Sequence, residues 1–166
     1  MLSVTSASNP TVIPATLANT TQCNASPSGG FAGPIGFVST TVNVKPAGNH
    51  VFMTASAELG PGNASGGGYE MQFFACWQDA TTNGAITPFA DDESAQAAGT
   101  VYINALGLFE FTRSGITTTS DAINATDTYS FGLCAIETCR SSFGAPWTNT
   151  NGTAVGSSKV VVMVVP

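Results

Sequence analysis

Residues 51–59 have the sequence VFMTASAEL, in which apolar and polar side chains alternate. Val51, Met53 and Leu59 share one side of an extended chain with the two alanines between them, whereas Phe52 and Glu58 fall on the other. This period of two predicts a β-strand with one face buried. The preceding VNVK at 42–45 and the Pro-Ala-Gly-Asn turn at 46–49 predict a second strand joined to it in a hairpin.

The alternation recurs along the chain and predicts strands over 69–77, 100–104, 108–112 and 129–136, with a final valine-rich strand over 160–165. Turns rich in glycine, proline and asparagine separate them, and no stretch has the spacing of an amphipathic helix longer than two turns. The aromatic residues Phe73, Phe109 and Phe131 alternate as core residues do. Such a series of short strands predicts an all-β fold, a sandwich or a barrel.

The 166-residue chain has 43% hydrophobic and only 8% charged residues, so it can fold as one domain with a largely uncharged polar surface. Ten acidic residues against four basic ones give a net charge of −6, with no basic stripe for phosphates or anionic lipids. The longest apolar run, 160–165, is far shorter than the ~20 residues of a membrane-spanning helix. We therefore expect no nucleic-acid partner and no membrane insertion.

Residues 1–35 are rich in Pro, Ser, Thr, Asn and Gly and lack sustained periodicity. This composition predicts an extended N-terminal arm, followed by a β-sandwich domain over 36–166. Apolar patches such as Val12-Ile13 can dock on a sheet or on a neighbouring subunit. The first residues have neither the basic nor the apolar region of a secretory signal, so we expect a removed signal or another export route.

Four cysteines, Cys23, Cys76, Cys134 and Cys139, form no Cys-x-x-Cys pair, and the chain has one histidine. Disulfides explain them better than a zinc site does, and this places the protein outside the cell or at its surface. Asn-x-Ser/Thr acceptors for N-glycosylation occur at Asn19, Asn24, Asn63, Asn124 and Asn151. A chain this rich in Asn, Ser and Thr also produces such tripeptides by chance.

The order of these segments resembles the C1q/TNF-like jelly rolls of small secreted bacterial proteins, which often follow collagen-like stalks. The matching segments are VNVKPAG at 42–48, VFMTASA at 51–57, the aromatic strand ending at Cys76, YSFGLC at 129–134 and the final valine-rich strand. The resemblance implies a jelly-roll sandwich, a trimer or larger homo-oligomer, and a Cys76–Cys134 disulfide.

The chain departs from this family in having no Gly-x-y stalk, in carrying Cys23 and Cys139, and in its long arm. These departures admit another assembly, in which the arm adds a strand to a neighbour. With Cys76 bridged to Cys134, a Cys23–Cys139 disulfide would tie the arm to the sandwich. Four cysteines allow three pairings, and the close spacing of Cys134 and Cys139 keeps a local loop possible.

Residues suited to catalysis are sparse, so we expect no enzyme. His50 is the only histidine and follows a turn, and Glu58 and Glu70 fall on solvent-facing strand positions, with Glu110 the remaining candidate acid. The Asp91-Asp92-Glu93 cluster has the oxygen ligands that Ca²⁺ prefers, but it lacks the EF-hand spacing, so a solubilising loop is the first interpretation and a calcium site the alternative. Calcium is the one cofactor that the sequence suggests.

Two functions remain. The first is an extracellular structural subunit that forms a homo-oligomer or polymer through the arm or an edge strand. The second is a carbohydrate- or receptor-binding module with Trp147, within a Gly/Pro/Asn-rich loop, at its site. A tryptophan in such a loop can stack on a sugar ring or anchor a subunit contact, and more commonly it seals one end of a sandwich. The valine-rich strand at 160–165 favours the first, because such a strand must lie centrally in a sheet or be covered by a partner.

Overall fold

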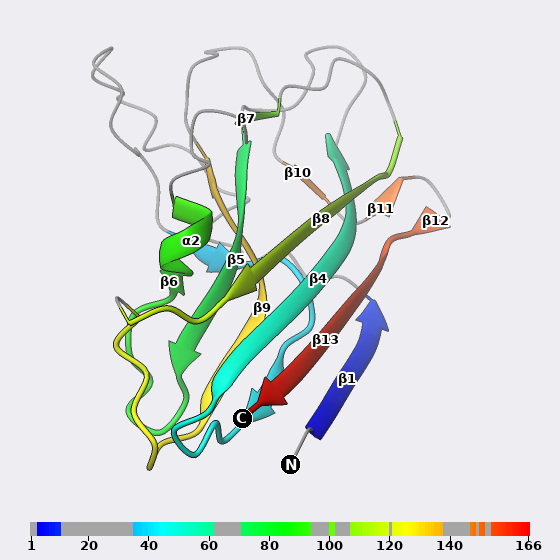
Figure 1. The fold of residues 1–166 in the computed structure, drawn as a ribbon. Coiled ribbons are helices and arrows are strands. Elements are labelled where there is room, and N and C mark those ends of the chain that lie inside the picture. Colours follow the sequence, from blue (N-terminus) through cyan, green and yellow to red (C-terminus); the bar gives the residue numbers. More distant parts are fainter. Residues whose placement is uncertain are drawn as a thin grey trace, which may run out of the picture.

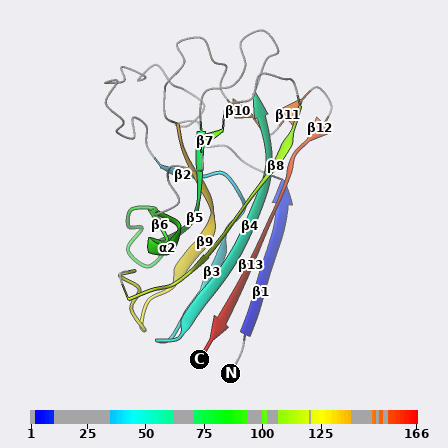
Figure 2. The same cartoon turned by 45° about the horizontal axis from the view of Figure 1, so that its top comes forward.

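The computed structural model describes residues 3–10, 35–61, 71–93, 100–101, 107–119, 121–137, 147–148, 150–151 and 154–166. Two antiparallel sheets pack face to face in these residues, and Figures 1 and 2 show the two layers. The all-β sandwich expected from the alternating pattern is therefore confirmed.

The first sheet has the strand order β1 (Ser3–Pro10), β13 (Ser157–Val165), β4 (His50–Pro61) and β8 (Phe109–Ile116), and β10 (Trp147–Thr148) pairs with the far end of β4. In the second sheet, β2 (Gly36–Phe37) and β3 (Val42–Val44) pair with β9 (Tyr129–Glu137), and β9 pairs with β5 (Met71–Asp79). The other edge of β5 holds β6 (Thr87–Pro88) and β7 (Thr100–Val101). A four-residue helix, α2 (Ala90–Glu93), follows β6, and β11 (Thr150–Asn151) pairs with β12 (Ala154–Val155).

Successive long strands alternate between the sheets. The chain passes from β1 to β3 in the other sheet, back to β4, across to β5, back to β8, across to β9 and back to β13. This interleaved order is that of a jelly roll. The hairpin expected from 42–45 and 51–59 is wrong, because β3 pairs with β9 while β4 pairs with β13 and β8. The turn between them, with Ala47 and Gly48 at positive φ, connects the two layers.

The core lies between the sheets and is formed by the inward-facing half of each strand. From β4 it receives Val51, Met53, Ala55, Ala57 and Leu59, the set that the sequence placed on one face. The facing strands add Phe73, Trp77, Tyr129, Phe131 and Leu133, and β13 adds Val160, Val162 and Val164. Trp77 and Tyr129 meet edge to face, with ring centroids 5.7 Å apart.

The valine-rich strand is central, as its composition predicted: β13 lies between β4 and β1. One edge of β13 pairs with β1, which is formed by residues 3–10 of the predicted arm of the same chain. The remainder of the arm, 11–34, lies outside the described residues.

The edge strand β8 differs from its prediction in length and in one core residue. It was expected to end at 112, but pairing with β4 extends it to Ile116, which lies opposite Phe52. Phe109, predicted as a core residue, is 37% exposed, whereas Phe111 packs against the core and stacks on Phe73 with ring centroids 4.3 Å apart. At Gly115 an added Cβ would lie 2.8 Å from the ring of Phe89, so a glycine here gives that buried ring its space.

Candidate functional site

An apolar row crosses the outer face of the first sheet from edge to edge. In register, Val4 lies opposite Met163, Met163 opposite Phe52, and Phe52 opposite Ile116. Val4 is 59% exposed and Ile116 is 43% exposed, whereas Met163 and Phe52 are half-buried. We call these four residues the apolar row; it spans strands β1, β13, β4 and β8, which lie side by side in Figure 1.

The next rows of the same face are mainly hydroxyl-bearing. Val161 and Thr54 lie beside the apolar row, and the Thr54 hydroxyl is 2.8 Å from that of Ser114 on β8. One row further on, Lys159 lies opposite Ser56. Short hydroxyl side chains give a flat surface that can form hydrogen bonds without the cost of removing a charge from water.

Carboxylates mark the far end of this face. Glu58 on β4 lies directly opposite Glu110 on β8, a like-charge pair that disfavours a close approach of the two side chains. Glu58 turns toward β13 instead, where its Oε2 accepts hydrogen bonds from the backbone N–H and the hydroxyl of Ser157, both at 2.8 Å. These two hydrogen bonds hold the pKa of Glu58 below its ordinary value of 4.5, and the bond from the Ser157 backbone N–H has the larger effect.

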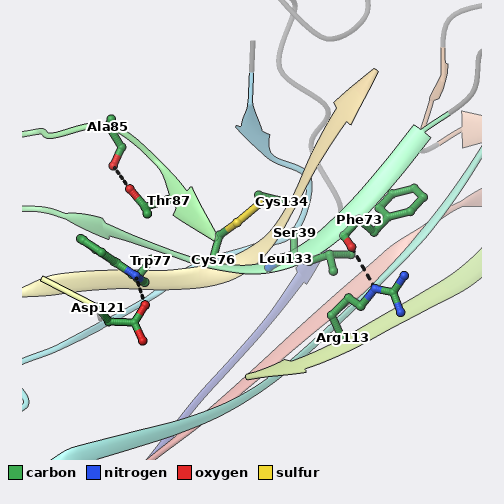
Figure 3. Close-up of a disulfide and its surroundings, with 10 residues drawn as sticks. All are labelled: Ser39, Phe73, Cys76, Trp77, Ala85, Thr87, Arg113, Asp121, Leu133 and Cys134. Atoms are coloured by element: carbon green, nitrogen blue, oxygen red, sulfur yellow. Dashed lines mark hydrogen bonds between the residues drawn. A yellow bond between two sulfur atoms is a disulfide. The ribbon is translucent and has the colours of Figure 1, made fainter. Parts of the chain in front are cut away.

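The outer face of the second sheet is different, because it carries a buried apolar cluster. Phe74, Cys76, Cys134 and Ile136 are buried there, and Ile35, Phe37 and Ile86 pack against them. Figure 3 shows the disulfide between Cys76 and Cys134, whose Cα atoms are 5.8 Å apart. Cys76 lies opposite Gly132 and Cys134 opposite Phe74, so the bridge joins diagonal neighbours on β5 and β9.

Buried Asp121 fixes the end of the sandwich near α2. Its Oδ1 accepts hydrogen bonds from the indole Nε1 of Trp77 and the backbone N–H of Ala90, each at 3.1 Å. Its Oδ2 accepts one from the backbone N–H of Thr118 at 2.8 Å. Figure 3 shows the carboxylate beside the Trp77 indole. These bonds join β5, the start of α2 and the loop after β8, which is a structural role.

Arg113 points inward from the edge strand β8. Its Nε donates a hydrogen bond to the carbonyl of Phe73 at 2.9 Å, as Figure 3 shows. On the same side of β5, the backbone N–H of Phe89 donates to the carbonyl of Ala75. Both bonds satisfy main-chain oxygens of β5 between its pairings with β7 and β6. An inward-pointing charge also hinders other chains from pairing with the β8 edge.

The predicted cysteine and loop residues have mixed outcomes. The Cys76–Cys134 disulfide is present, whereas Cys23, Cys139, Asn19, Asn24, Asn63 and Glu70 lie outside the described residues. The backbones of Trp147 and Asn151 belong to β10 and β11, but their side chains lie outside the description. The pairing of Cys23 with Cys139 and the sugar-stacking role of Trp147 stay predictions.

The calcium hypothesis also stays a prediction. Asp91 lies in α2, where its Oδ2 accepts a hydrogen bond from the backbone N–H of Ile116 at 3.1 Å, while the side chains of Asp92 and Glu93 lie outside the description. Among the side chains that are described, no three His, Cys, Asp or Glu residues are grouped closely enough to hold a metal ion.

Asn124 is exposed in the loop between β8 and β9. Its Oδ1 accepts hydrogen bonds from the backbone N–H of Thr126 at 2.9 Å and of Asp127 at 3.1 Å, and its amide donates to the Asp127 carboxylate. This acceptor tripeptide is therefore at the surface, and its glycosylation stays a prediction. His50 is exposed at the start of β4.

No family model matches the chain, and no curated protein matches it. Within the described part of the chain, no helix has the length and apolar character needed to cross a membrane.

The sequence did not predict the apolar row, although it predicted the outward orientation of one of its residues. Alternation placed Phe52 on the outer side of its strand, but Val4 fell in the predicted arm and Ile116 in a predicted loop. The apolar alternation at 109–116 ends at Phe111, and Arg113 and Gly115 take the next inward positions, so periodicity gave no signal for the longer strand.

Proposed function

We propose that the chain is an extracellular structural subunit that assembles with copies of itself, and that the outer face of the β1-β13-β4-β8 sheet forms the contact. The apolar row carries this proposal. Four apolar side chains lie in register across the whole sheet, and Val4 and Ile116 are the most exposed of them. Burial of this surface against a partner lowers the free energy, because it removes apolar area from water.

The difference between the two outer faces supports the choice of surface. The second sheet already has apolar cover from its own chain through Ile35, Phe37 and Ile86. On the first sheet, the polar rows beside the apolar row are mostly neutral, with Lys159, Glu58 and Glu110 toward one end. Two copies can therefore approach over the apolar row without burying many charges.

The strand order supports the resemblance to C1q/TNF-like domains, which remains part of the proposal. A jelly roll is the fold that this resemblance implied, and with it a trimer or larger homo-oligomer. The Cys76–Cys134 disulfide and the low share of charged residues fit a protein that works in an oxidising compartment outside the cell.

The test is the mass of the native particle, measured by sedimentation equilibrium with negative-stain microscopy alongside. We expect an oligomer, and we expect the double variant Phe52→Thr/Ile116→Thr to shift it toward smaller species. Loss of about 1 kcal/mol of apolar contact per side chain weakens association roughly fivefold for each substituted residue in the contact. Threonine keeps the β-propensity, so the fold is retained.

Phe109→Thr is the matched control, because Phe109 is also exposed on β8 but lies outside the apolar row. It should leave the particle mass unchanged, and circular dichroism should give the same spectrum for all variants. A wild-type monomer at micromolar concentrations would overturn the assembly proposal. An oligomer that responds equally to Phe109→Thr and to the double variant would place its interface elsewhere.

A further inference from the structure

The first strand contributes little to the core of its own chain. Among the β1 side chains that the structure describes, those of residues 3–8, only the half-buried Ala7 packs against the core, whereas Ser3, Val4, Thr5, Ser6 and Ser8 are exposed. The buried residues of the core belong to other strands and to the loop positions Val38 and Phe89. Side-chain packing therefore holds β1 only weakly to its own sheet.

Main-chain pairing holds β1 instead. Its eight residues pair antiparallel with β13, from Ser3 opposite Val164 to Pro10 opposite Ser157. Without β1, the long edge of a valine-rich strand would be open, which is a template for another chain. Main-chain hydrogen bonds do not depend on which copy supplies the strand, because any extended segment with the same small side chains satisfies them equally.

The connection after β1 is long enough to reach another molecule. Residues 11–34 separate β1 from Ile35, where the described chain resumes. A connection of this length spans up to about 80 Å when fully extended, more than the width of a domain of this size. Chain length therefore places no limit on which copy receives the strand.

We propose that β1 is exchanged in the assembly, so that β1 of one copy pairs with β13 of another. This inference rests on the proposed self-assembly and names its contact. The apolar row would then be shared, because Val4 of one copy would lie opposite Met163 of another. Two copies that exchange β1 reciprocally form a dimer. If each copy instead passes β1 to the next copy, the assembly is a ring where the last copy meets the first, and a filament where it does not.

Single-cysteine variants distinguish pairing within a chain from pairing between chains. Ser6 and Val161 lie directly opposite one another on the outer face. One subunit carries Ser6→Cys and the other Val161→Cys; the two are co-expressed with different tags and oxidised. A Ser6→Cys to Val161→Cys bond in this mixture can form only between two chains. We expect a covalent species of twice the subunit mass that contains both tags, with the bond identified by peptide mapping.

Two controls complete the design. Ser3→Cys with Val161→Cys is out of register, because Ser3 pairs with Val164, and should give at least tenfold less product. The double variant Ser6→Cys/Val161→Cys in one chain should give covalent multimers. If it cross-links only within the chain while sedimentation still shows an oligomer, exchange is wrong and self-assembly stands. If the particle is a monomer and the mixture gives no product, both proposals fall.

Discussion

At the scale of single residues, the buried side chain of Asp121 joins three parts of the fold: β5, the start of α2 and the loop after β8. Its carboxylate accepts hydrogen bonds from Trp77 Nε1, Ala90 N and Thr118 N. We predict that Asp121→Ala lowers the free energy of unfolding by about 3 kcal/mol, because it leaves buried donors without acceptors. Urea unfolding followed by circular dichroism measures this change.

Asp127→Ala is the matched control for that substitution. Asp127 accepts hydrogen bonds from Asn124 and Thr126 in its own exposed loop, so its removal should cost less than about 1 kcal/mol. Asp121→Asn, which retains one acceptor oxygen, should fall between the two alanine variants. Equal losses for Asp121→Ala and Asp127→Ala would contradict the role assigned to Asp121.

Glu58 gives a prediction about pH. The N–H and hydroxyl of Ser157 lower its pKa in the folded protein, so the folded carboxyl binds its proton less readily than the unfolded one. Its contribution to stability is therefore fully present above about pH 4.5 and is lost as the pH falls through the lower folded pKa. An NMR titration of the Glu58 carboxyl carbon should give a pKa below 4.5.

Ser157→Ala separates the two causes of this shift. Losing the hydroxyl should raise the pKa of Glu58 part of the way toward 4.5, since the backbone N–H of residue 157 remains. The pKa of Asp79, lowered mainly by the Thr82 hydroxyl, should not respond to this substitution. A Glu58 pKa of 4.5 or above in the wild type would show that the Ser157 contact does not form.

At the scale of elements, the Cys76–Cys134 disulfide joins β5 to β9 across a sequence separation of 58. Closing a loop of this size restricts the unfolded chain and is worth about 4 kcal/mol on the chain-entropy model. We predict that Cys76→Ala/Cys134→Ala lowers the free energy of unfolding by roughly this amount. The urea m-value should rise as well, because the unfolded chain becomes more expanded.

The control for the double variant is Cys23→Ala/Cys139→Ala, compared before and after reduction, because it can lose only the Cys76–Cys134 bond and keeps both sulfur atoms of that bond. A loss well below 1 kcal/mol in both samples would mean that the bridge does not restrict the unfolded chain. Peptide mapping without reductant establishes first that Cys76 is joined to Cys134, and it tests the predicted Cys23–Cys139 pairing in the same experiment.

The sequence predicted the faces of the strands better than their neighbours. Alternation within one strand is a local property, so it placed Met53 inward, Phe52 outward, and both Cys76 and Cys134 on the side away from the core. Pairing is not local: Val4 lies opposite Met163, at the other end of the chain. The expected hairpin failed for the same reason, because the tight turn at Gly48 fits a connection between layers as well as one within a sheet.

At the scale of the whole molecule, the two outer faces of the sandwich assign different tasks to the two sheets. The face with the disulfide is covered and cross-linked, so it stabilises the subunit. The face with the apolar row is open and has few charges, so it is suited to contact another subunit. Strand β1, which we propose is exchanged, lies at the edge of the face with the apolar row and supplies Val4 to that row. The proposed strand exchange and the proposed face contact would therefore reinforce one another.

This arrangement predicts how association responds to salt. Apolar contacts and main-chain pairing are not screened by ions, whereas a contact between Lys159 and the Glu58/Glu110 pair of another copy would be. Raising NaCl from about 0.05 M to about 0.5 M should therefore change the association constant by less than about threefold, as measured by sedimentation equilibrium. Ammonium sulfate should strengthen association, because it favours apolar burial. Dissociation by NaCl, reproduced at low salt by Lys159→Gln, would instead assign the contact to the charged end of the face.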